Sequence, residues 1–88
     1  MLSHQTNDAE ALGLAALAAT LTDERRARRF LDLTGLSAEE LRERLAERSL
    51  LAAVLAFLEN HEPDLLAVAE AIGVKPDALV AAKAELER

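Results

Sequence analysis

The residues best suited to catalysis or metal binding gather in one short stretch, His61-Glu62-Pro63-Asp64. An imidazole next to carboxylates can transfer protons or hold a divalent metal ion. The spacing of His61, Glu62 and Asp64 nevertheless matches no H-E-x-x-H or similar metal-binding pattern. Glu62 before Pro63 is typical of the acidic first turn of a helix. We therefore predict no catalytic residue, no metal site and no cofactor. Under the alternative that the protein is an enzyme, this stretch is its candidate site.

The densest charge feature is a group of four arginines: Arg25, Arg26, Arg28 and Arg29. Guanidinium groups pair with carboxylates or phosphates in bidentate geometry, so this group could bind an acidic partner or RNA. The alternative is a solvated helix face, on which Glu24 lies one turn before Arg28. The chain has no Tyr or Trp on which single-stranded nucleic acid could stack. The four arginines are the candidate partner-binding residues.

A third pattern, within residues 64–87, resembles a helix-turn-helix. Its turn contains Gly73, and its second helix begins at Pro76. A DNA-binding protein would present the start of that helix to the major groove, and here these positions include Lys75 and Asp77. They offer no Arg, Asn or Gln to the base edges, and phosphates would repel Asp77. We expect the turn to serve the architecture and keep nucleic-acid binding as the alternative function.

Composition narrows the classes of protein to which the 88-residue chain can belong. This length predicts one small domain. The net charge of −6 argues against nonspecific binding to nucleic acid or to anionic membranes, and the absence of cysteine excludes thiol chemistry and disulfides. The longest apolar run, Leu50 to Leu58, is too short to span a bilayer, and the N-terminus lacks the basic start of a secretory signal. We therefore expect a cytoplasmic protein.

Helices are expected to position all of these residues. Ala and Leu dominate the 51% hydrophobic content, and residues that favour strands are few. Residues 1–7 are predicted to be a flexible polar tail and residues 8–88 a single helical domain. The first helix is apolar on nearly every side, which predicts burial. The first expected helix ends near Leu21, and the second starts after a Thr22 cap. The third spans about 38–47, and the fourth starts at Ser49. The fifth follows the turn at 60–63, and the sixth starts at Pro76.

Two glycine turns separate helices in the same way. Gly35 suits the left-handed backbone that often ends a helix. Ser37 and Glu40 then form an S-x-x-E capping box for the next helix, which should bury Leu41 and Leu45. Gly73 and Pro76 provide a similar helix end and helix start, because proline is tolerated in the first helical turn. These five turn and cap residues are predicted to be structural.

The two turns belong to an internal repeat, in which residues 12–41 align with residues 50–79 without gaps. The two most apolar helices coincide, and Gly35 coincides with Gly73. Helical repeats bury their faces against each other. We therefore predict two three-helix units whose first helices form a shared core.

Several of these segments together resemble a known family. They are R-F-L-x-L-T-G-L at Arg29–Leu36, Leu41-Arg42, L-x-x-V-L-x-F-L at Leu51–Leu58, Glu62, Gly73 and Pro76. The combination resembles an uncharacterised bacterial family, domain of unknown function 3572, which is found mainly in alphaproteobacteria. The chain departs from the family pattern at Ala56, where the family has an Asp. The resemblance implies a compact helical fold, no established activity and no catalytic residues to transfer.

We predict a compact all-α bundle of five or six short helices that acts as a small non-catalytic protein-interaction or adaptor module. Its partner would be another protein or a second copy of the chain. The mean hydropathy of +0.06 hints at an apolar patch that such a partner covers. The candidate contact surfaces are this patch and the face that bears Arg25 to Arg29. Nucleic-acid binding is the first alternative and an enzyme the second.

Overall fold

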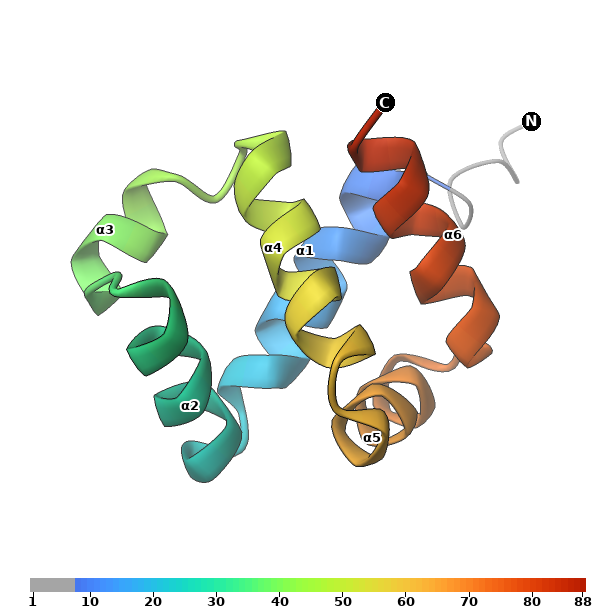
Figure 1. The fold of residues 1–88 in the computed structure, drawn as a ribbon, viewed down its shortest axis with the longest axis horizontal. Helices are drawn as coiled ribbons and strands as arrows, with labels where there is room; N and C mark the ends of the chain where they lie inside the picture. Colours follow the sequence, from blue (N-terminus) through green and yellow to red (C-terminus); the bar gives the residue numbers. More distant parts are fainter. Residues whose placement is uncertain (1–7) are drawn as a thin grey trace.

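The computed structural model describes residues 8–88, so the expected tail at residues 1–7 lies outside the described part. Within residues 8–88 there are six helices and no strand, which confirms the all-α prediction. None of these helices has the length and apolar character needed to cross a membrane. In chain order they are α1 (Ala9–Leu21), α2 (Glu24–Thr34), α3 (Ala38–Glu43), α4 (Arg48–Glu59), α5 (Glu62–Ile72) and α6 (Pro76–Leu86) (Figure 1).

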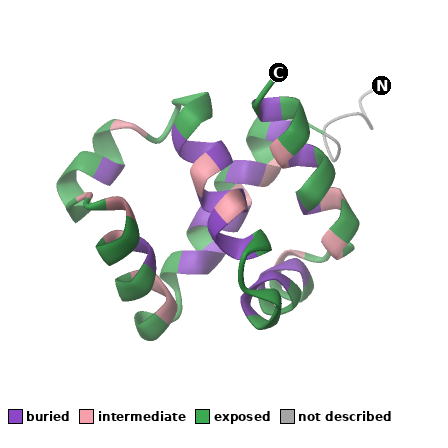
Figure 2. Ribbon diagram, viewed as in Figure 1, coloured by how far each residue is buried: buried purple, intermediate pink, exposed green. Residues whose placement is uncertain are grey.

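The core lies where α1 and α4 cross. Helix α6 packs against both of them, α5 packs against their other ends, and α2 and α3 lie on the opposite side of the molecule (Figure 1). Figure 2 shows the buried residues concentrated on α4 and on the faces of α1, α5 and α6 that meet it. The largest fully buried apolar side chains are Leu17, Phe30, Val54, Leu55, Leu58, Val68 and Leu79.

A glycine permits the close approach of the two central helices. A Cβ atom added to Gly13 on α1 would lie 2.9 Å from the Cβ of Leu51 on α4. Real Cβ atoms essentially never come this close. Any larger residue at position 13 would therefore push the two helices apart.

The internal repeat is visible in the bounds of the helices. Helix α5 begins and ends 38 residues after α2, and α6 begins 38 residues after α3. Gly35 and Gly73 end the second helix of each unit with φ angles of 75° and 77°. The left-handed backbone predicted at both turns is thus present.

Equivalent positions of the two units also meet in space. Gly13 faces Leu51, and the ion pair between Glu10 and Arg48 has an oxygen–nitrogen distance of 2.9 Å. Asp64 lies 38 residues after Arg26, and their side chains form an ion pair at 3.7 Å. Contacts of a residue with its own equivalent are expected where two like units pack about an approximate two-fold axis. The repeat therefore describes the tertiary arrangement as well as the sequence.

The approximate symmetry breaks down at α3. Helix α6 has 11 residues and packs against α1 and α4, whereas α3 has six and lies at the edge of the molecule (Figure 1). We expected the third helix to continue to about residue 47. It ends at Glu43 because residues 44–47 form a turn, closed by the Glu47 N–H donating to the Arg44 carbonyl at 3.0 Å. The Arg44 side chain also pairs with the Glu47 carboxylate at 2.8 Å.

Helix starts follow the predictions at some positions and differ at others. The Ser37–Glu40 capping box is confirmed, with bonds of 3.1 and 2.9 Å, and α6 begins at Pro76. Thr22 was expected to start the second helix, but it ends α1, where its hydroxyl donates to the Ala19 carbonyl. Asp23 caps α2 instead, and its carboxylate accepts from the Arg26 N–H at 3.0 Å. Helix α4 begins one residue before Ser49, after Glu47.

Two predictions of burial were wrong. Leu14 on α1 is 45% exposed, so this helix is not covered on every side. Leu45, expected in the core, is 37% exposed because α3 has already ended. Both leucines face the same groove, which is described below.

Candidate partner-binding surfaces

The four arginines of α2 do not share one surface. Arg26 points inward: its side chain is 13% exposed and donates to the Ala19 carbonyl of α1 at 3.2 Å. Arg29 pairs with Asp64 on α5. Arg25 and Arg28 are exposed and form no ion pair within residues 8–88. Two of the four candidates thus hold α2 in place, and two remain free to meet a partner.

Asp64 is the centre of this buried ion pair. The residue is 8% exposed, and its two carboxylate oxygens face Arg26 and Arg29 separately. The guanidinium of Arg29 also lies 5.5 Å from the ring centre of Phe57, a distance suited to a cation–π contact. Within residues 8–88, the buried Nε of Arg26 has no hydrogen-bond partner. The cluster therefore joins α2 to α4 and α5, and removing the charge of Asp64 would leave the Arg26 guanidinium buried and unpaired.

The stretch that could have carried enzyme chemistry is divided by this arrangement. Asp64 is turned into the ion pair, whereas His61 and Glu62 are exposed at the start of α5. Within the part of the chain that the structure describes, no three His, Cys, Asp or Glu residues are placed to hold a metal ion. His61, Glu62 and Asp64 are close in sequence, but their side chains do not face one site.

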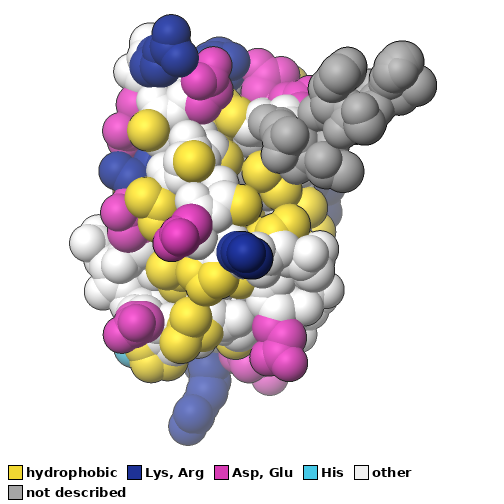
Figure 3. Space-filling view, turned by 90° about the vertical axis from the view of Figure 1, so that its right-hand side faces the viewer, with side chains coloured by type: hydrophobic (Ala, Val, Ile, Leu, Met, Phe, Trp, Pro, Cys, Tyr) yellow, Lys and Arg dark blue, Asp and Glu magenta, His cyan; other side chains and the backbone are white. Residues whose placement is uncertain are grey.

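The helix-turn pair of α5 and α6 packs into the core. Leu79, Ala82 and Leu86 of α6 are buried. Lys83 pairs with Glu59 at 3.3 Å, and the hydrogen bond from this lysine to Glu59 raises its pKa. Figure 3 shows this side of the molecule, where Lys and Arg side chains are scattered among acidic and apolar ones. Among the residues that the structure describes, the basic side chains on this side form no continuous patch.

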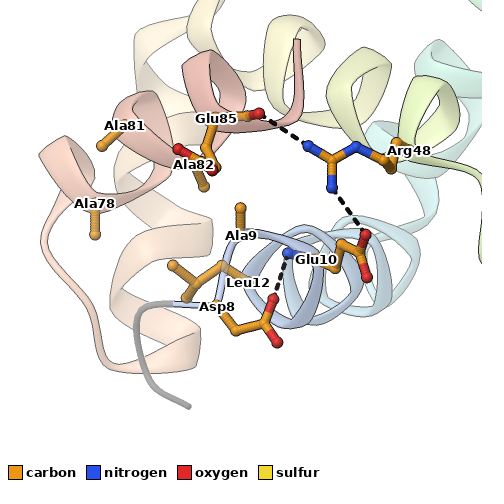
Figure 4. Close-up of a pocket in the computed structure, with 9 residues that line it drawn as sticks. All are labelled: Asp8, Ala9, Glu10, Leu12, Arg48, Ala78, Ala81, Ala82 and Glu85. Carbon is orange, nitrogen blue, oxygen red and sulfur yellow. Dashed lines mark hydrogen bonds and ion pairs between the residues drawn. The ribbon is translucent and has the colours of Figure 1, made fainter. Parts of the chain in front are cut away.

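A hollow of about 550 Å³ lies between the starts of α1 and α4 and the side of α6 (Figure 4). Arg48 reaches across it, donating to the Glu10 carboxylate and to the Glu85 carbonyl, both at 2.9 Å. Ala78 and Ala82 form part of its wall on α6. Because Arg48 already has these partners, the hollow offers no free cation to a ligand.

A second hollow, about 310 Å³ in volume, lies between α1, α2 and α3, and we call it the leucine groove. Its lining is almost wholly apolar, and Arg42 is its single charged residue. Leu14 is 45% exposed, and Leu21 and Leu45 are each 37% exposed. The groove is lined by Leu14, Leu17, Ala18, Leu21, Leu31, Ala38, Leu41, Arg42 and Leu45.

The sequence hinted at this groove without locating it. Mean hydropathy indicated that some apolar surface would stay uncovered, and α1 carries more Leu and Ala than one face needs. Which face stays open depends on where α3 ends and how far it stands from α1. Neither quantity is encoded in the pattern of α1 itself.

Comparison with known protein families gave a match, over a range that contains the segments Arg29–Leu36 and Leu51–Leu58. The model of a family described as "Protein of unknown function (DUF3572)" matches residues 6–88. Comparison with curated proteins gave no match, and comparison with solved structures gave none either. Because the match covers nearly the whole chain, the protein belongs to the family of domain of unknown function 3572.

Proposed function

We propose that the protein is a non-catalytic interaction module that binds a partner protein through the leucine groove. The observation that carries this proposal is the exposure of Leu14, Leu21 and Leu45 around one apolar hollow. Clustered exposed apolar side chains mark protein-interaction sites, whereas single ones are ordinary. A partner that covers them would remove their apolar surface from water, which is favourable.

Arg25 and Arg28 do not line the groove, but they are exposed on one of the helices that form it. This helix is α2, whose Leu31 lines the groove. Charges at the rim of an interface speed association and select partners more than they add affinity. We assign the main binding energy to the leucines and only a steering effect to these two arginines.

Site-specific photo-crosslinking in the native cells tests the proposal. The crosslinking amino acid replaces Leu14 in one protein and Leu66 in the other. Leu66 on α5 is the matched control, because it is 47% exposed and lies outside the groove. We expect a discrete adduct from position 14 that is absent from position 66 and is lost when Leu21→Glu is added. No adduct at 14, or the same adducts from both positions, would refute the proposal.

A further inference from the structure

We propose that the occupant of the leucine groove is an amphipathic helix of a partner protein, with a carboxylate beside its apolar stripe that pairs with Arg42. This inference rests on the function proposed above and names the chemistry of the partner. Three features of the described residues carry it: the broken repeat, the charge of the groove, and the distribution of apolar side chains elsewhere.

The broken repeat argues for a helix. In the second unit, α6 closes against α4, and Ala82 and Leu86 in its last turns are 4% and 5% exposed. The equivalent positions of the first unit are Arg44 and Arg48, which lie in the turn after α3 and at the start of α4. Because α3 has 6 residues and α6 has 11, α1 lacks about one and a half of the helical turns that cover its counterpart α4. A helix from outside would supply the missing cover.

The groove walls also suit a helical ligand. Ala18 on α1 and Ala38 at the start of α3 have small side chains, which let a backbone come close. The leucines around them can accept apolar residues spaced three and four apart on one helix face. The volume of about 310 Å³ suits a few side chains inserted from the surface rather than an enclosed small molecule.

The charge of the groove argues for an acidic residue on the ligand. Arg42 is exposed at the groove and forms no ion pair within residues 8–88. No carboxylate lines the groove to neutralise it. A guanidinium prefers bidentate pairing with a carboxylate, and partial burial under a ligand would strengthen that pairing.

The surface of the chain argues against a second copy as the occupant. Outside the groove, the exposed large apolar residues in the described part of the chain are Leu33, Leu66 and Val80. They lie one each on α2, α5 and α6. Outside the groove, no described helix therefore presents an exposed stripe of several large apolar residues that could fill the groove of another copy.

Selection from a displayed library of helices tests the inference. The library consists of ~16-residue peptides, a length at which isolated helices begin to be stable. Leu is fixed at positions i, i+3, i+4 and i+7, and the flanking positions vary among Asp, Glu, Lys and Gln. One Trp in each selected peptide reports binding by fluorescence, because the protein itself has no Trp or Tyr.

We expect the selected helices to carry Asp or Glu at one flanking position. Leu14→Glu should weaken their binding at least tenfold, whereas the matched Leu66→Glu should leave it unchanged. Arg42→Glu should reverse the preference, so that the peptide with Lys in place of the acid binds about tenfold better than the parent peptide. Lys75→Glu makes the same change of charge at an exposed position outside the groove and should have no effect.

Two results would overturn the inference in different ways. Binders without a preferred acid, or with a preference that Arg42→Glu leaves intact, would refute the carboxylate while leaving the groove as a docking site. A library that yields no binder sensitive to Leu14→Glu would refute the helical ligand. The photo-crosslink at position 14 then distinguishes the two proposals. An adduct with a different protein would keep the groove as a docking site and reject its helical occupant. An adduct of two copies of this chain would make the occupant a second copy. The absence of any adduct would reject the groove itself.

Discussion

Replacing Asp64 with Asn should destabilise the domain strongly without changing its helical content in the native state. The substitution keeps the shape of the side chain but removes the charge that Arg26 and Arg29 share. Removing one partner of a buried ion pair costs about 3–5 kcal/mol, because the other charge stays buried and unpaired. Arg29 is 47% exposed and can recover water, whereas Arg26 is 13% exposed and cannot. We therefore expect a loss of about 3 kcal/mol, at the lower end of that range.

Urea and thermal unfolding followed by circular dichroism measure this loss. For a domain of this size, about 1 kcal/mol corresponds to a shift of roughly 4–8 °C, so Tm should fall by about 12–24 °C. Asp32→Asn is the control, because Asp32 is exposed on the same helix as the arginines and forms no ion pair within residues 8–88. Its unfolding free energy should change by no more than about 0.5 kcal/mol.

A double variant separates the ion pair from simple packing. Arg26→Leu combined with Asp64→Leu removes both buried charges and fills their space with apolar atoms. Such replacements are often neutral or stabilising, so this variant should recover most of the loss seen with Asp64→Asn. A loss below about 1 kcal/mol for Asp64→Asn would show that water reaches Arg26, and the reasoning from burial would then fail.

Three smaller predictions concern the backbone and the helix caps. Gly73→Ala should cost about 1–2 kcal/mol in chemical unfolding, because the open space around this glycine leaves only the strain of φ 77°; an unchanged midpoint would contradict this. Gly13→Ala should lose about 1 kcal/mol net, since overpacking against Leu51 outweighs the gain in helix propensity; a more stable variant would show that α1 and α4 can move apart. The backbone hydrogen bond from Arg26 lowers the pKa of Asp23 below its usual 3.8. The ionised carboxylate therefore stabilises the fold above pH 3.8, and this stabilisation is lost as the pH falls through the lowered pKa of Asp23. Urea midpoints between pH 2 and 6 should therefore fall less steeply for Asp23→Asn, and parallel curves would refute the role of this cap.

The repeat has a physical consequence at the positions where the two units meet. A symmetric pair of like units would place identical residues against each other, and two identical charges at such a point would repel. Here Arg26 faces Asp64, and Glu10 faces Arg48. Because the two units carry opposite charges at these equivalent positions, the side chains attract each other and the units can pack symmetrically. A separate difference between the units, the turn at residues 44–47 that ends α3, leaves the leucine groove open.

The sequence by itself determined the features that depend on a few neighbouring residues. The composition predicted helices, Gly35 and Gly73 predicted the left-handed turns, and Ser37 with Glu40 predicted the capping box. The spacing between the two glycines also predicted two related units. These signals are local, because a cap or a turn is formed by atoms within a few positions along the chain.

Only the tertiary structure decided which side chains are available to a partner. Arg26 and Arg28 are alike in sequence, yet Arg26 is turned toward Asp64, 38 residues away, and Arg28 is left in solvent. Leu14 and Leu17 are likewise similar in α1, but Leu14 is 45% exposed and Leu17 is 1% exposed. These outcomes depend on where α3 ends and on where α5 places Asp64 relative to α2. Burial is a property of distant segments that meet in space, so a periodic pattern within one helix does not determine it.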